Sequence, residues 1–165
     1  MRSAMPDRES LPAGWQGEAN PEVREAKDAL HDCVAMLAAC KSAGLVAMGP
    51  DSYDEGTVNR PEGDIEHEAA VFVLSFDSIQ GAKKVMKGLA EGGRASGARQ
   101  PVTIQAGAQD TEAHSTSNSG GYMTQATMRV GKVVIAVRGE ELKDPSDIQP
   151  IAQTLVDRVK KASQG

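Results

Sequence analysis

The stretch GYMTQATMRVGKVVIAVRG, residues 121–139, constrains the fold most, because it has the pattern of two β-strands folded back on a tight turn. Side chains along residues 122–130 fall into two alternating sets, as expected for a strand whose successive side chains point to opposite faces of a sheet. Gly131 fits the turn, since glycine adopts positive φ without steric cost. The hairpin therefore predicts an antiparallel sheet whose Val and Ile face is the floor for packed helices.

Three amphipathic helices are predicted, because apolar residues recur at three- and four-residue spacing in three segments. The first spans about residues 21–42, and the second follows a cap formed by Asp77 or Ser78. The third begins with Asp144 as its cap and ends near residue 162. The apolar face expected for the second helix consists of Ile79, Ala82, Val85, Met86 and Leu89.

Residues 45–49, 65–76 and 100–107 are predicted to add strands to the hairpin. The second half of 65–76 is apolar on both faces, which predicts a central strand covered twice. The polar stretches 50–64 and 108–121 are predicted as loops. The order α-β-β-α-β-β-β-α indicates the α+β class: an antiparallel sheet of about four to five strands with three helices packed mainly on one face.

The length of 165 residues suits a single domain with its own core. We expect residues 21–163 to form that domain, and residues 1–20 to be a flexible leader or a remnant of an expression vector. The net charge of −5, without a Lys or Arg block, argues against a nucleic-acid partner. No apolar run approaches the roughly 20 residues of a membrane-spanning helix.

Cys33 and Cys40 lie seven residues apart within the first predicted helix. A continuous helix separates such residues by about 10.5 Å along its axis, beyond the roughly 7 Å that a disulfide spans. We therefore expect two small buried thiols on the apolar stripe. A helix break near Ala38 would instead allow a disulfide.

Candidate catalytic groups do not form a recognisable motif. His31, His67 and His114 fall in three separate predicted elements, and the sequence has no nucleophile elbow, phosphate loop or zinc spacing. The acidic stretch DSYDEG lacks the spacing of a calcium loop. We therefore expect no enzymatic activity, metal or cofactor; a hydrolase that uses His114 with a serine of its own loop is the alternative.

The predicted surface favours ligand binding. Both long polar loops could flank one end of the sheet and form an acidic rim that attracts cationic ligands; its members are Asp51, Asp54, Glu55, Asp110 and Glu112. Methionines such as Met48, Met86 and Met128 adapt to irregular partners or fill an aromatic-poor core. The candidate ligand-binding residues are Asp51, Tyr53, Asp54, Glu55, Tyr122 and Met123.

The segment TMRVGKVVIAVRGEELKDPSDIQPIAQTLVDRVKKA resembles the C-terminal part of small extracytoplasmic lipoproteins of actinobacteria, and LPAGW resembles linkers near the start of such mature chains. A similar architecture occurs in extracellular sensor domains of actinobacterial serine/threonine kinases. The resemblance covers roughly residues 65–162.

Within this class the chain is most similar to a lantibiotic self-immunity lipoprotein. This resemblance implies a non-enzymatic domain that sequesters a peptide antibiotic outside the cell membrane. We expect the protein to be a monomer. It also implies a lipidated cysteine at the start of the mature chain; no cysteine precedes Cys33, so we expect the anchor to lie outside this sequence. The alternative is an extracytoplasmic sensor or envelope-associated domain with another ligand.

Overall fold

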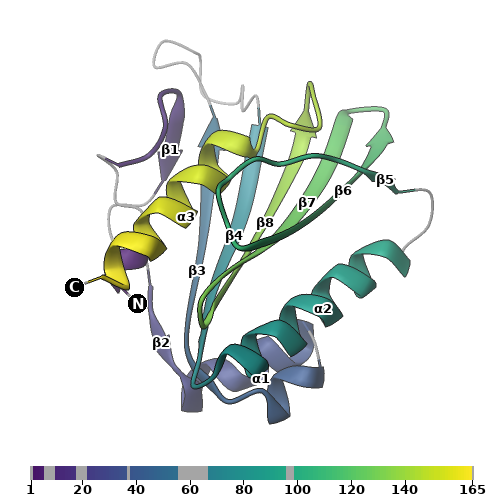
Figure 1. The fold of residues 1–165 in the computed structure, drawn as a ribbon. Helices are drawn as coiled ribbons and strands as arrows, with labels where there is room; N and C mark the ends of the chain where they lie inside the picture. The colour runs from purple at the N-terminus through teal and green to yellow at the C-terminus, as the bar shows by residue number, and fades with distance from the viewer. Residues whose placement is uncertain are drawn as a thin grey trace.

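The computed structural model describes residues 2–5, 10–17, 22–36, 38–55, 67–95 and 99–164. They form an antiparallel α+β fold whose main sheet path is β1-β3-β4-β8-β7-β6-β5, with β2 paired to β3 (Figure 1). The strands are β1 Trp15–Gly17, β2 Arg24–Glu25, β3 Leu45–Glu55, β4 His67–Phe76, β5 Gln100–Pro101, β6 Asp110–Asn118, β7 Gly121–Val130 and β8 Val133–Leu142. The helices are α1 Ala26–Met36, α2 Ile79–Ala95 and α3 Gln149–Ala162, with short 3-10 helices η1 Arg2–Ala4 and η2 Ala38–Ser42. The predicted class is confirmed, with more strands than expected.

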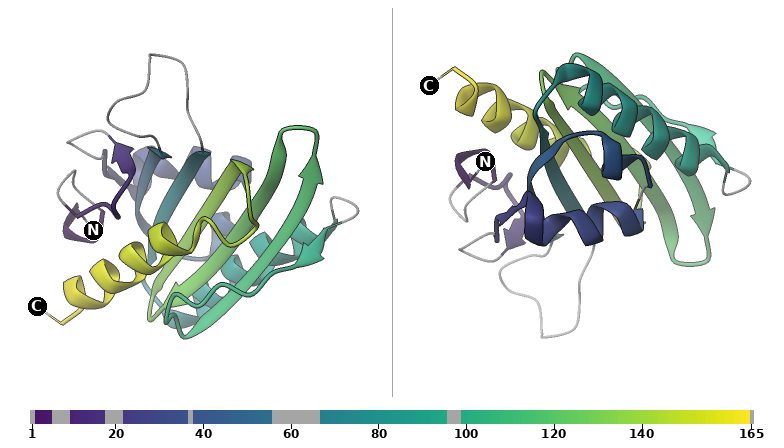
Figure 2. Two further views of the ribbon diagram at one scale, coloured as in Figure 1. Left: turned by 90° about the horizontal axis from the view of Figure 1, so that it is seen from above. Right: turned by 90° about the horizontal axis from the view of Figure 1, so that it is seen from below.

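Apolar side chains on both faces of the sheet create two cores. Val71 and Val73 of β4 pack with α3, whereas Leu74 and Phe76 pack with α1 and α2. The right panel of Figure 2 shows α1 and α2 on the near side of the strands. The prediction that the helices pack mainly on one face therefore holds for α1 and α2, whereas α3 covers the opposite face. The central position of β4, covered on both sides, is confirmed.

The hairpin that dominated the sequence forms as predicted. β7 and β8 pair directly, with Val130 opposite Val133, and Gly131 adopts a φ of 58° in the turn. Ile135 and Val137 of β8 lie in the core beneath α3. The Val and Ile face is thus a floor for this helix.

Residues 100–107, which were predicted as a strand, leave the sheet after their first residues. Only Gln100 and Pro101 of the expected strand 100–107 pair, although Ile104 and Ala106 are buried in the core shared with α3. The backbone amide of Gln105 donates to Oε1 of Gln149, the first residue of α3. The alternation in 100–107 therefore reflects burial against a helix, and the predicted strand is wrong beyond residue 101.

The polar loops predicted at 50–64 and 108–121 are also corrected. β3 extends to Glu55, and residues 110–118 form β6. Among residues 110–118, only Ala113 and Ser115 are fully buried, because one side of this strand lies near the sheet edge. Residues 56–66 lie outside the described part of the chain.

The N-terminal residues join the core. Met5 and Trp15 are buried with η1 beside α3, and a Cβ on Gly49 of β3 would lie 2.7 Å from Sδ of Met5. The expected flexible leader is therefore wrong for these residues. Figure 2 shows the N-terminal segment next to α3.

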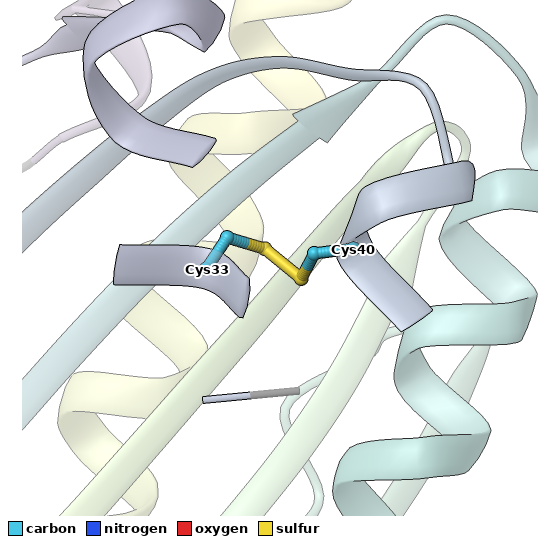
Figure 3. Close-up of a disulfide and its surroundings, with 2 residues drawn as sticks. All are labelled: Cys33 and Cys40. Carbon is cyan, nitrogen blue, oxygen red and sulfur yellow. A yellow bond between two sulfur atoms is a disulfide. The ribbon is translucent and has the colours of Figure 1, made fainter. Parts of the chain in front are cut away.

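The first predicted helix, 21–42, is wrong at its start and near its end. Residues 24–25 form β2, α1 ends at Met36, and η2 begins at Ala38. This change of direction brings the Cα atoms of Cys33 and Cys40 to 5.8 Å, and the two residues form a buried disulfide (Figure 3). The expectation of free thiols is therefore wrong; the helix break allowed as an alternative is present.

The predicted start of the third helix is a separate turn. The backbone amide of Asp144 donates to Oδ2 of Asp147, and the Ser146 hydroxyl and amide donate to Oδ1 of Asp144. These Ser146 bonds lower the pKa of the Asp144 carboxyl. α3 itself begins at Gln149, with Pro150 in its first turn.

Alanine substitutions at two glycines are expected to change the stability of the protein in opposite directions. A Cβ on Gly139 of β8 would lie 2.2 Å from Cγ2 of Ile148, so Gly139→Ala is expected to lower the free energy of unfolding by about 1–3 kcal/mol through overpacking. Gly92 in α2 is exposed with no atom within 4 Å of an added Cβ, so Gly92→Ala is expected to raise it by about 0.5–1 kcal/mol. Urea denaturation of both variants measures the difference. Equal effects would contradict the packing of β8 against Ile148.

Candidate functional site

A groove of about 610 Å³ lies between α2 and the start of β6. The volume falls within the range of clefts that hold small ligands. Figure 1 shows α2 running alongside this part of the sheet. Its helix wall consists of Lys83, Met86, Lys87, Ala90 and Glu91, and its strand wall consists of residues 109–112.

The sequence of α2 positions the helix wall. Ala82, Val85 and Leu89 are buried against the sheet, so the neighbouring positions 83, 87 and 91 lie on the shoulder of the helix and border the groove. Ser78 precedes the helix and its Oγ accepts a hydrogen bond from the Gly81 amide, which confirms the predicted cap. The prediction that Ile79 belongs to the apolar face is wrong, since this residue is 45% exposed.

Contacts from the preceding segment fix the start of α2. Gly81 lies so close to the Ala43 carbonyl that an added Cβ would clash with it. Nζ of Lys84 donates to Oγ of Ser42 at 2.7 Å. Cys40 is buried in the same core as α2, and its disulfide ties this segment to α1.

Arg129 of β7 anchors the strand wall. Its side chain is 8% exposed and contacts Oδ2 of Asp110 through Nη2 at 2.6 Å and Nε at 2.7 Å. Nη1 donates to Oε1 of Gln109 and to the carbonyl of Gly131, each at 2.9 Å. The Gly131 amide also donates to Oε1 of Gln109. The guanidinium thus joins the first residues of the groove wall to the β7–β8 turn.

A small depression, without room for a ligand, adjoins the groove at Ala90 and Glu112, which line both. Its sheet side is lined by Glu112 and His114 of β6 and by Gln125 and Thr127 of β7. Nη1 of Arg99 donates to Oε1 of Gln125 at 3.2 Å at this end. Polar side chains therefore continue beyond Glu112 on the α2 face.

The structure does not bring the sequence-predicted ligand residues together. Asp51, Tyr53, Asp54 and Glu55 all belong to β3, and their side chains lie outside the described part. Tyr122, which is 37% exposed, and the half-buried Met123 lie on β7. β4 and β8 separate these strands, so the two sets are about 14 Å apart across the sheet.

The predicted acidic rim is wrong for the same reason. Asp110 and Glu112 line the α2–β6 groove, whereas Asp51 lies on β3, four strand steps and about 19 Å away. Met48, Met86 and Met128 are all buried in the cores, and Met86 also lines the groove. The groove residues that the sequence analysis missed are Lys83, Lys87 and Glu91. Their four-residue spacing beside the apolar face was the available signal.

No family model matches the chain, and no curated protein matches it. The fold is similar to the crystal structure of the extracellular domain of PknH from Mycobacterium tuberculosis, with a TM-score of 0.58 and 18% sequence identity. The match covers 90% of this chain and 86% of that chain. The expected likeness to kinase extracellular sensor domains is confirmed at the level of the fold. Within the described residues, no helix is long and apolar enough to cross a membrane.

Proposed function

We propose that this protein is a non-enzymatic extracytoplasmic domain that binds a small amphipathic ligand or peptide in the α2–β6 groove. The observation that carries the proposal is the composition of the groove. Met86 and Ala90, which are mostly buried, form a small apolar floor, and Lys83, Glu91 and Glu112 place charges around it. Binding sites commonly combine an apolar floor with a few polar groups that fix orientation.

The disulfide supports an extracytoplasmic location. Disulfides persist in oxidising compartments and are rare in the cytosol. Cys33 and Cys40 are both buried, so their bond is a structural one. The similar fold of the PknH domain, which is extracellular in that protein, agrees with this location. A lipid anchor to the cell membrane and a monomeric state belong to the same proposal.

The geometry of β6 supports a non-enzymatic role. His114 lines the depression under α2, whereas its neighbour Ser115 is buried and donates to the Met123 carbonyl. Because successive side chains of a strand alternate, Ser115 points to the other face of β6. Thr124 donates to the Ser115 hydroxyl. The opposite directions of these two side chains argue against a hydrolase in which His114 activates Ser115.

Two ligand classes follow from different observations. The fold likeness favours a sensor or envelope-associated domain. The carboxylates of Glu91 and Glu112 at the groove instead favour a cationic peptide, as in lantibiotic self-immunity. In the second case the domain would sequester the antibiotic before it reaches the membrane.

Calorimetric titration separates these classes. We expect a purified lantibiotic or a linear Leu/Lys amphipathic peptide to bind, and the variant Glu91→Gln/Glu112→Gln to weaken binding about three- to tenfold, since each exposed ion pair contributes about 0.2–1 kcal/mol. The matched variant Glu68→Gln/Glu140→Gln removes the same charge from β4 and β8 and should bind normally. Binding that both variants weaken equally would reject the groove, and no heat with either peptide would reject a cationic ligand.

A further inference from the structure

The strand wall of the groove lies along the edge of β6. Residues 109–112 line it consecutively, whereas the adjoining depression is lined by the alternate residues Glu112 and His114. Because side chains alternate between the faces of a strand, a hollow over one face meets every second residue. Four consecutive lining residues therefore indicate a groove that includes the edge and its backbone groups.

This edge has no neighbouring strand at residues 110–112. In the described part of the chain, β5 pairs with β6 only at His114 and Ser115. The Val102 amide still donates to the Ala113 carbonyl, but in the described chain no strand continues beyond it, and the Gln105 amide donates to Gln149 of α3 instead. An exposed edge of this kind is a template for an added strand.

The backbone groups of Thr111 point outward from this edge. The Ala113 carbonyl accepts a hydrogen bond from the Val102 amide, so the polar groups of residue 113 point away from β7. Residues two apart in a strand direct these groups the same way. The amide and carbonyl of Thr111 therefore face the groove.

The charges along the groove give it a polarity. Asp110 is neutralised by Arg129, and Nζ of Lys87 lies 3.7 Å from Oε1 of Glu91. Among the described residues that line the groove, this leaves Lys83 as the cation at the Asp110 end. Glu112 lies beside Ala90 toward the other end. Lys83 and Glu91 are about 12 Å apart along the helix, the length of three to four extended residues.

We propose that the groove binds an extended peptide as an antiparallel strand beside residues 110–112 of β6. An apolar side chain of the peptide packs on Met86 and Ala90, and a carboxylate lies at Lys83. An antiparallel peptide runs from the Glu91 end toward Lys83, so its C-terminus lies at Lys83. The carboxylate at Lys83 is therefore either the C-terminal carboxylate of the peptide or an acidic side chain. This inference rests on the proposed function of the groove and adds the ligand class and its binding mode.

The test uses N-acetylated Lys-Thr-Val-Thr-Leu with a free C-terminus, titrated to millimolar concentration into ¹⁵N-labelled protein. We expect amide shifts at residues 83–91 and 109–112. Two N-methylated peptides are compared, one methylated at both threonines and one at the valine and the leucine. Because only alternate residues of an added strand bond to β6, one of the two should bind at least about tenfold more weakly and the other normally. The C-terminal amide and Lys83→Gln should each cost about three- to tenfold if the terminal carboxylate is the recognised group.

A protein variant provides an independent test. Thr111→Pro removes the outward amide and should abolish binding; proline is tolerated at the edge of a sheet, so the strand should still form. Thr111→Val keeps the amide and should bind the peptide. Groove shifts that neither N-methylation pattern changes would overturn strand addition but leave the groove as a ligand site. No groove shifts with this peptide would also overturn it; the Leu/Lys peptide then shows whether the proposed function fails as well.

Discussion

Replacing Arg129 with Met is expected to lower the free energy of unfolding by about 2–4 kcal/mol. The side chain is buried and bonds to Asp110, Gln109 and the Gly131 carbonyl. Breaking a buried ion pair leaves the remaining charge without a partner. Because the Asp110 side chain is 46% exposed and can regain water, the expected loss of stability is smaller than the largest values for buried ion pairs. Urea denaturation measures the change through the transition midpoint.

Arg138→Met is the matched control. Arg138 lies on β8, is 54% exposed and pairs with Glu140 at 2.8 Å. Exposed ion pairs contribute about 0–1 kcal/mol, so this variant should be close to wild type. A loss for Arg129→Met no larger than that for Arg138→Met would show that the Arg129 network does not hold the groove wall.

Removing the disulfide is expected to destabilise the protein by about 2–3 kcal/mol, the value for closing a short loop in the chain-entropy model. The bond joins the end of α1 to η2, and η2 contacts the start of α2. Cys33→Ala/Cys40→Ala should therefore loosen the support of the groove helix while the β7–β8 hairpin remains. Guanidinium denaturation with and without dithiothreitol provides the measurement.

Dithiothreitol should lower the midpoint of the wild type and leave that of the double variant unchanged. Mass spectrometry after alkylation of the denatured, unreduced protein should find no modified cysteine. Two alkylated cysteines would contradict both the disulfide and its support for an extracytoplasmic location.

Side-chain periodicity was enough to predict the centre of the fold. The β7–β8 hairpin alternates about a glycine turn, and β4 ends in an apolar run, so the hairpin pairing and the coverage of β4 follow from local pattern. β6 lacked this signal, because an edge strand needs few apolar residues and only Ala113 and Ser115 are fully buried. In residues 102–106 the alternation predicted burial correctly, but periodicity does not say whether a strand or a helix covers the residues.

Long-range geometry explains the remaining differences. Local spacing favoured a continuous helix through Cys33 and Cys40, whereas the tertiary fold turns the chain after Met36. The ligand site was placed on Asp51 and Tyr122 because the sequence does not reveal strand order. Lys83 and Asp110 line the same groove only because α2 lies along a strand that the sequence did not predict.

The central claim is that the α2–β6 groove is the ligand site of this domain. Its most direct test is to map amide shifts across the ¹⁵N-labelled protein during titration with the linear Leu/Lys peptide. We expect saturable shifts centred on residues 83–91 and 109–112, with little change at residues 51–55 and 122–123. Shifts centred on residues 51–55 and 122–123 instead would contradict it and restore the site that the sequence suggested.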